Sequence, residues 1–406
     1  MTKNLLKMGS APEGYDAALI VEEFEKSGTC LLHVARDDKR MAAVKDALNF
    51  FAPDIPIKIF PSWDCLPYDR ISPNSEISSR RLSILTDLAQ NASSKYIILT
   101  TVNAATQRIP NRSILSSAIF QAEVGKHIDL NLLYKFLGKM GFSKTSTVSE
   151  PGDYAVRGGI IDIFAPGEVG AIRLDLFGDV LDGVRQFDPI SQRTVSKMQS
   201  IRLVPVSEVI FDEESISRFR KNYRKEFGAS HSKDILYENV SMGNKYQGVE
   251  HWLPFFHEKL ETIFDYLPKA TVTLDDNVDL ARTSRWEVII NQFQSRKENL
   301  NQKSKLDSIY KPIEPEQLYL TENEWKSALN SRTVLQFSPF PQIPDSNVRD
   351  AGCKIGKNFS VERKVKNINI FNKLASYIKS EIETKSVIVA SYTDGARDRL
   401  SGLLED

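Results

Sequence analysis

The first hundred residues alternate short apolar runs with longer segments whose apolar positions recur every three or four residues. Three of the runs are typical of buried strands: GTCLLHVAR (28–36), IPIKIF (55–60) and KYIILTT (95–101). Residues 37–51 and 75–89 place apolar side chains at helical spacing between these runs. A strand–helix–strand–helix–strand order predicts a parallel sheet covered by helices.

Between residues 127 and 206 the helical spacing occurs once and then gives way to alternation. A helix is predicted from Asp129, as its N-cap, to Gly141, which would terminate it. The strand-like runs that follow are KTSTVSE (144–150), DYAVRGGIIDIFAP (153–166), AIRLDLF (171–177), VLDGVRQFD (180–188) and SIRLVPV (200–206). This order predicts an antiparallel sheet with a helix on one face and the other face open.

After this region the helical pattern returns. Residues 212–229 form a predicted amphipathic helix, KATVTLDD (269–276) a strand and residues 279–300 a long helix, which together would complete the α/β domain that the insertion interrupts. Five basic side chains on the first of these helices are compatible with DNA binding, but a solvated helix face explains them better in a neutral chain. His251 and His257 have no cysteine partner and fit no common zinc spacing, so packing explains them better than a metal does.

Beyond a capping box at Thr321 and Glu324, the composition changes. Residues 336–352 contain three prolines and no periodicity, which predicts a linker or an extended strap. Residues 369–406 then read as helix, strand and helix. A lone strand cannot form a sheet, so we expect the sequence to be the first part of a longer protein.

Composition limits the protein class. A length of 406 residues predicts two to four domains, and 41% hydrophobic with 26% charged residues is typical of a globular protein. No apolar run approaches the roughly 20 residues that span a bilayer, and the first residues lack a signal-peptide core, so we expect a cytoplasmic protein without a membrane partner. The three scattered cysteines indicate a reducing compartment and no zinc site, and the 53 basic and 53 acidic side chains cancel.

The run AIRLDLF has an unusual polar side. Ile172, Leu174 and Leu176 make an ordinary core face, whereas Arg173, Asp175 and Phe177 share the opposite one, near Arg157 of the preceding run. A surface Arg–Asp pair beside a half-buried phenylalanine would explain this pattern. A protein-docking surface would also explain it, because arginine and aromatic side chains are enriched at interface hot spots.

The segment KMGSAPEGYDAALIVEEF (7–24) lies where a nucleotide-binding α/β domain carries its phosphate loop. Gly9 and Gly14 fit such a loop, but Tyr15 and Asp16 stand where a lysine and a hydroxyl residue should follow. A carboxylate at that place repels phosphate. We therefore predict a degenerate nucleotide loop, no catalytic residues and no hydrolysis.

Three long motifs together resemble one known family. FPSWDCLPYDRISPNSEISSRRLSIL (60–85), YAVRGGIIDIFAPGEVGAIRLDLFGDVLDGVRQFDPISQRTV (154–195) and GVEHWLPFF (248–256) are similar, in this order, to the N-terminal part of the bacterial transcription-repair coupling factors, Mfd. Residues 1–330 resemble the UvrB-homology module of that family, and the remainder resembles the start of its next domain.

The resemblance implies a fold and a partner. The fold would be a degenerate helicase-like (RecA/P-loop-type) α/β parallel-sheet domain with an inserted α+β antiparallel-sheet domain, followed by a partial small α/β domain. The insertion of this family recruits UvrA, through residues that match Arg157, Arg173 and Phe177, with Asp175 beside them. The family lacks a working phosphate loop here. VTLDDNVD (272–279) resembles a degraded metal-binding box, and the stretch after LPYD is too short for the DNA-gripping hairpin of UvrB.

On this basis we expect five segments: 1–118 and 206–332 as the two parts of the helicase-like domain, 119–205 as the UvrA-binding insertion, 333–353 as a linker, and 354–406 as the start of a further domain.

The expected function is that of an adaptor without metal or cofactor that recruits UvrA to stalled RNA polymerase. By resemblance, later domains of the parent protein bind RNA polymerase and double-stranded DNA and use ATP and magnesium. A UvrB-like ATPase that clamps damaged DNA is the alternative, which measurable ATP affinity would favour. A stand-alone DNA-binding protein is the third option, and salt-sensitive duplex binding would reveal it.

Overall fold

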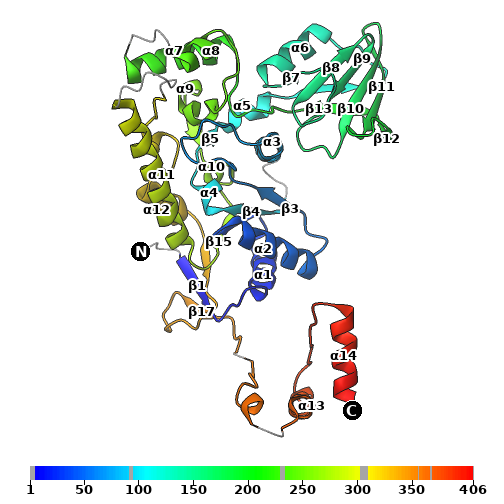
Figure 1. The fold of residues 1–406 in the computed structure, drawn as a ribbon, viewed down its shortest axis with the longest axis vertical. Helices are drawn as coiled ribbons and strands as arrows, with labels where there is room; N and C mark the ends of the chain where they lie inside the picture. Colours follow the sequence, from blue (N-terminus) through cyan, green and yellow to red (C-terminus); the bar gives the residue numbers. More distant parts are fainter. Residues whose placement is uncertain are drawn as a thin grey trace. The chain divides into compact units, whose positions relative to one another are not determined.

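The computed structural model describes residues 5–90, 95–228, 234–301, 310–354, 356–365 and 368–405. The chain divides into two compact units, Met1–Gly352 and Cys353–Asp406. The first unit contains a helicase-like layered domain and an inserted domain, as the sequence predicts (Figure 1).

A seven-stranded parallel sheet forms the centre of the layered domain, in the order β17-β1-β16-β15-β2-β4-β3. Its strands are β1 (Leu5–Gly9), β2 (Leu31–Ala35), β3 (Ile57–Phe60), β4 (Ile97–Thr101), β15 (Thr271–Leu274), β16 (Val334–Phe337) and β17 (Val348–Asp350). The predicted α/β fold class is therefore confirmed. β2 and β4 are buried along their whole length, as expected for strands covered on both faces.

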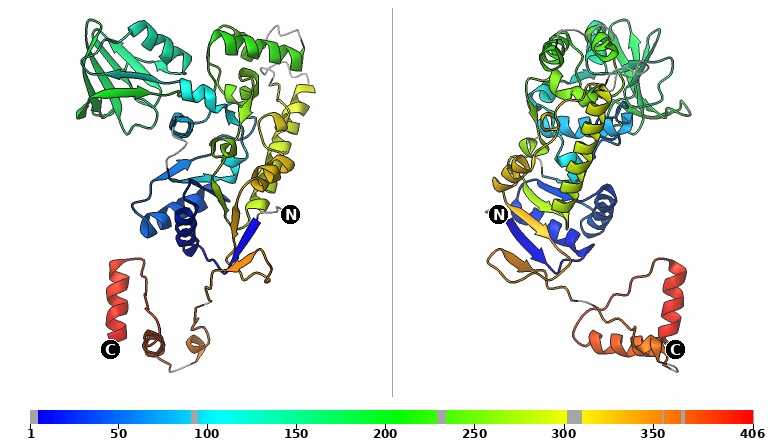
Figure 2. Two further views of the ribbon diagram at one scale, coloured as in Figure 1. Left: turned by 180° about the vertical axis from the view of Figure 1, so that it is seen from behind. Right: turned by 60° about the vertical axis from the view of Figure 1, so that its left-hand side comes forward.

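Helices cover both faces of this sheet (Figure 2). On one face, α1 (Tyr15–Ser27) and α2 (Asp38–Phe51) bury Ile20, Val44 and Leu48 against the strands. On the other, the core is built from α3 (Ser75–Gln90), α4 (Val102–Ala105), α5 (Arg112–Ser117), α10 (Ile263–Tyr266), α11 (Val278–Asn301) and α12 (Glu322–Asn330). The Thr321–Glu324 capping box predicted for the last of these helices is present.

The insertion leaves the layered domain after α5. It consists of β6 (Phe120–Glu123), α6 (Leu130–Lys139), β7 (Ser143–Lys144), β8 (Asp153–Arg157), β9 (Ile160–Ile163), β10 (Ala171–Phe177), β11 (Val180–Phe187), β12 (Thr194–Met198) and β13 (Ser200–Leu203). The six strands β12-β11-β10-β9-β8-β7 form one sheet, antiparallel except for its β7–β8 edge pair. Leu133 and Leu137 of α6 pack on the inner face of this sheet, and the helix has the predicted Asp129 N-cap.

A second core joins two of the motifs that stand far apart in the sequence. Trp63 and Tyr68 of the first motif pack with Trp252 of the third, among α7 (Glu213–Phe227), α8 (Ile235–Ser241), η1 (Val249–Trp252) and α9 (Leu253–Phe256). Ser72 Oγ accepts from the Gly248 N–H at 2.8 Å and donates to Glu250 at 2.7 Å. The short pair β5 (Ile109–Pro110) and β14 (Leu260–Glu261), with η2 (Pro315–Gln317), completes this region.

Several predicted elements differ from the structure. Of the run 144–150, only Lys144 is in a strand, as the second residue of β7, and β13 pairs with β6 in a separate two-stranded ladder. The predicted 333–353 linker instead contributes β16 and β17, which lie on either side of β1. In the second unit the described residues form η3 (Glu362–Lys364), α13 (Ile370–Ile382) and α14 (Asp394–Glu405), and the strand expected between the two helices is absent from them.

Candidate docking site

The outer face of the inserted sheet carries the residues that the sequence singled out. Cross-strand register places Arg173 of β10 between Asp162 of β9 and Arg185 of β11, and Asp175 between Ile160 and Gly183. Because alternate side chains of a strand point to opposite faces, all these side chains lie on the side away from α6. Arg157 belongs to the same face at the end of β8, opposite Ile160.

One end of this face is closed by a small core. Val148, Ala155, Phe164, Ala171 and Phe187 pack together there, and all are buried. The end toward the β10–β11 turn has no such cover among the described residues, and Phe177 lies there with 81% of its surface exposed. Partner contact is therefore possible at the Phe177 end of the face, which we call the open end.

Arg173 lies at the border between the closed and open ends. Its Nε and Nη2 donate to the two carboxylate oxygens of Asp162 at 2.7 and 2.8 Å, and its guanidinium stacks 4.6 Å from the ring centre of Phe187. The hydrogen bond to Asp162 raises the pKa of the Arg173 guanidinium, which remains charged. The Asp162 side chain is 4% exposed. The family resemblance implies that Arg173 contacts UvrA, whereas in the structure two of its donors already bind a buried carboxylate of the same sheet.

Asp175 has a partner that sequence reasoning missed. Arg185 Nε and Nη2 donate to its carboxylate at 2.8 and 2.7 Å, and both side chains remain partly exposed. The alternation of VLDGVRQFD placed Arg185 on a polar face, but only the register across β10 and β11 shows which acid it meets. Arg185 lies opposite Arg173 in the register but pairs with Asp175, toward the open end, and its side chain is 36% exposed, so a partner can reach its edge.

Arg157 and Phe177 differ from Arg173 in their accessibility. Arg157 is exposed and donates to Ser146 O and to Thr147 Oγ1 at 2.8 Å, so it also holds the loop before β8. Phe177 ends β10 next to Gly178, whose φ of 64° allows the tight turn into β11. An exposed aromatic ring on a rigid strand end is suited to fill a pocket on a partner.

The predicted nucleotide loop lies between β1 and α1. Gly9 ends the strand, Gly14 precedes the helix with φ 97°, and Tyr15 begins the helix with an exposed side chain. Asp16 is 2% exposed, and its carboxylate bonds the Gly14 N–H at 2.9 Å and pairs with Arg40 of α2. Asp275, from the segment that resembles a degraded metal box, pairs with the same Arg40.

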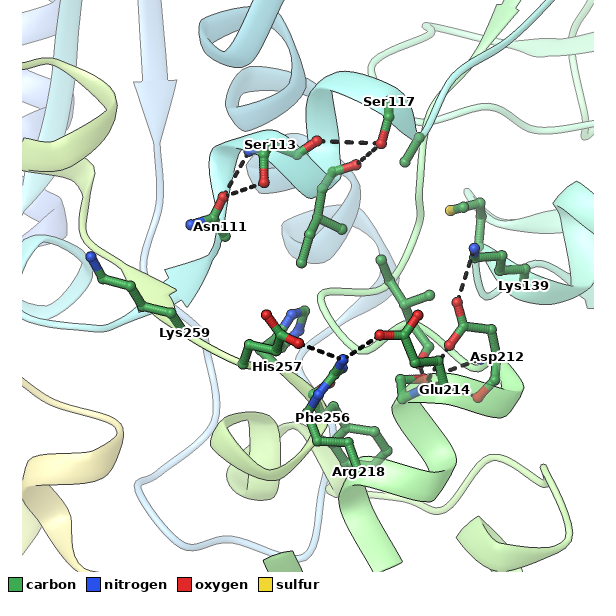
Figure 3. Close-up of a pocket in the computed structure, with 16 residues that line it drawn as sticks. Asn111, Ser113, Ser117, Lys139, Asp212, Glu214, Arg218, Phe256, His257 and Lys259 are labelled. Carbon is green, nitrogen blue, oxygen red and sulfur yellow. Dashed lines mark hydrogen bonds and ion pairs between the residues drawn. The ribbon is translucent and has the colours of Figure 1, made fainter. Parts of the chain in front are cut away.

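A pocket of about 410 Å³ lies where α5, α6 and α7 meet (Figure 3). Four of its charged side chains form two ion pairs: Lys139 with Asp212 at 2.9 Å, and Arg218 with Glu214 at 2.6 Å. Burial raises the pKa of Asp212, but hydrogen bonds from Ser215 and Lys139 outweigh it and lower the pKa overall. The Lys139–Asp212 pair connects the insertion to the start of α7, and the Arg218–Glu214 pair lies within α7, so we assign the pocket a structural role.

Among the helices within the described residues, none is both long and apolar enough to cross a membrane.

Comparison with known proteins identifies both the insertion and the chain. Residues 120–209 match the family model described as UvrB interaction domain. The chain is 30% identical to the transcription-repair-coupling factor of Haemophilus influenzae over 398 residues, which cover 98% of this chain and 34% of that protein. The factor of Rickettsia bellii is 28% identical over 97% of this chain, and that of Escherichia coli is 29% identical over 78%. The chain thus spans about a third of the length of the first two curated relatives. Since this likeness runs through nearly the whole chain and includes the UvrB interaction domain, the chain belongs to the transcription-repair-coupling factors.

Proposed function

We propose that this chain acts in transcription-coupled DNA repair as a non-catalytic adaptor that recruits UvrA through the open end of the inserted sheet. The observation that carries the proposal is Phe177, an 81% exposed aromatic side chain that ends β10 within a UvrB interaction domain. Arg157 and Arg185 lie on the same face, opposite Ile160 and Arg173 respectively. By family likeness, RNA polymerase and double-stranded DNA are partners of the parent protein, which uses ATP and magnesium in other domains.

The role of each residue on this face follows from how far its side chain is buried. Phe177 supplies apolar area that becomes desolvated when a partner covers it. Arg157, and the partly exposed Arg185–Asp175 pair, can form charge-assisted hydrogen bonds at the rim. Arg173 acts through Asp162 and Phe187: it keeps β9, β10 and β11 in register, and is therefore a positioning residue for the surface.

The experiment is a binding titration of purified UvrA against this chain and its variants. Phe177→Ala and Arg157→Ala should each weaken binding by about 1–4 kcal/mol, which corresponds to roughly 5- to 1000-fold. Leu132→Ala and Lys135→Ala on α6 are matched controls, since both residues are exposed on the opposite side of the insertion. If the Phe177→Ala and Arg157→Ala variants bind UvrA as tightly as the control variants do, the proposed site is refuted. Wild-type chain that fails to bind UvrA would refute the adaptor function.

Nucleotide titration separates the adaptor from a UvrB-like ATPase. The buried Asp16–Arg40 pair at the start of α1 supports the adaptor, because a carboxylate there repels the phosphates that an ATPase must bind. We expect no ATP affinity in this chain. Saturable ATP binding would favour the ATPase.

A further inference from the structure

The loop between β1 and α1 has the form of a phosphate cradle whose hydrogen-bond donors are already used by the chain itself. In phosphate loops, the backbone N–H groups between strand and helix point at the anion. Here the Ser10 and Ala11 N–H groups donate to the carbonyls of Phe340 and Ser338 at 3.0 and 2.9 Å. These acceptors lie on the segment that leaves β16, which we call the strap (residues 338–342).

The strap lies tightly against the end of β1. A Cβ added to Gly9 would come within 2.9 Å of the Gln342 backbone nitrogen, so any larger residue would displace the strap. Beyond the strap, β17 adds to β1 in parallel register, from Lys7↔Val348 to Gly9↔Asp350. The strap is therefore fixed at both ends by sheet pairing, through β16 and β17.

Asp16 occupies the anion position of the cradle. One carboxylate oxygen accepts from the Gly14 N–H at 2.9 Å, and the other pairs with the Arg40 guanidinium. The side chains of Asp16 and Arg40 are each 3% exposed. A helix N-terminus with an N–H donor and a buried guanidinium offers the contacts that a bound phosphate receives, and here a carboxylate receives them.

Arg40 extends this contact across the sheet. Its Nε donates to Asp275 Oδ1 at 3.1 Å, and Arg36 Nη1 lies 3.2 Å from Asp275 Oδ2. Arg36 also pairs with the exposed Glu13 at 2.7 Å. The network connects α1, α2 and the ends of β2 and β15, the elements that a bound nucleotide would otherwise hold together.

We propose that Asp16 is a built-in substitute for a phosphate group, which keeps this vacated cradle permanently in its occupied arrangement. Removing the Asp16 carboxylate should open a site for a free tetrahedral oxyanion of the phosphate class, held by Arg40 and the start of α1. The strap still covers the Ser10 and Ala11 donors, so such a site would fit an inorganic ion and no nucleotide.

The test compares the melting temperatures of wild-type chain and Asp16→Ala in phosphate or sulfate with those in chloride of equal ionic strength. Asp16→Ala should melt about 5 °C lower than wild type in chloride, and should regain about 2 °C in 100 mM phosphate or sulfate. The melting temperature of wild type should be the same in both salts. The same should hold for Glu13→Gln, which keeps the buried Asp16–Arg40 pair. If Asp16→Ala is unfolded in chloride, the same comparison follows the return of helical circular dichroism on addition of phosphate.

Dependence on Arg40 distinguishes a specific site from a general salt effect. In Asp16→Ala/Arg40→Met, the phosphate-dependent gain should disappear. An Asp16→Ala variant without selective recovery, or a wild type that gains as much as the variant, would overturn the proposal. This inference does not depend on UvrA binding, so its failure would leave the proposed function untouched.

Discussion

Replacing Arg173 by alanine should destabilise the insertion before it affects any partner. The variant removes both N–H donors from Asp162, whose side chain is 4% exposed, and leaves its carboxylate buried without an ion partner. Breaking a buried pair in this way costs about 3–5 kcal/mol. Arg173 itself is 19% exposed, so water can enter the vacancy, which favours the lower end. Loss of stacking on Phe187 adds about 0.5–1 kcal/mol.

We therefore expect a loss of about 3–4 kcal/mol for Arg173→Ala, against less than about 0.5 kcal/mol for the exposed Phe177→Ala. Urea unfolding followed by circular dichroism measures both. The described tryptophans lie outside the insertion, so their fluorescence would not report on it directly. Hydrogen exchange of β9, β10 and β11 should instead localise the loss of stability to the insertion. Protection should fall in these strands while β2 and β4 of the central sheet keep theirs.

A double variant tests the cause. Adding Asp162→Ala to Arg173→Ala removes the buried carboxylate that has lost its ion partner. The double variant should recover more than half of the lost free energy of unfolding. The reasoning fails if Arg173→Ala stays within 1 kcal/mol of wild type, or if the double variant is no more stable than the single one. Either outcome would mean that Arg173 is free to serve a partner. The expected outcome means that binding losses in Arg173→Ala cannot be assigned to contact with UvrA, whereas those in Phe177→Ala can.

Two further predictions concern stability. Burial lowers the pKa of His33 and of His251 to about 4. On unfolding, each imidazole regains its ordinary pKa of 6.5. The stability that the two neutral side chains contribute is therefore fully present above pH 6.5 and is lost as the pH falls toward 4. Between pH 7.5 and 5.5 these two histidines should therefore lower the free energy of unfolding by about 2.5–3 kcal/mol, measured by urea titration at both values; a flat profile would contradict this. Gly248→Ala should cost about 2 kcal/mol or more, since its φ is 78° and the new Cβ would lie 2.9 Å from the Arg70 carbonyl carbon. Thermal melting beside Gly28→Ala, whose backbone is also left-handed (φ 64°, ψ 4°) and whose added Cβ would lie 4.0 Å from Lys95 Nζ, separates the clash from backbone strain, and equal losses would exclude the clash.

Elements that depend on local signals were predictable from the sequence. α2 and α3 start and end within a residue of the predicted ranges, because their periodic apolar faces and polar first turns are encoded within one segment. The Asp129 cap and the Thr321–Glu324 capping box are contacts over three residues, which spacing alone can show. The fold class followed from the order of such elements.

Strands whose partners are distant were not predictable. β17 is three residues long, follows a proline-rich segment, and exists because the edge of β1, more than 300 residues earlier, accepts it. The run KSVIVAS in the second unit has the stronger strand composition and forms no strand in the described residues, because the described part of that unit contains no other strand with which it could pair. The same limit applies to Arg173: alternation placed it on the outer face, but cross-strand register decides that it meets Asp162 and that Asp175 meets Arg185.

The role of Asp16 in the nucleotide loop depends on contacts that the sequence does not show. From the sequence, Asp16 is only an acidic residue where the hydroxyl residue of a phosphate loop should stand, and its expected effect is repulsion of phosphate. In the fold, that carboxylate bonds the helix N-terminus and a buried arginine that also reaches Asp275 at the end of β15. On the proposal made above, the residue expected to prevent phosphate binding supplies the contacts that a bound phosphate would make. We therefore propose that this domain, which carries its own anion between α1, α2 and β15, needs no bound nucleotide to keep these elements together.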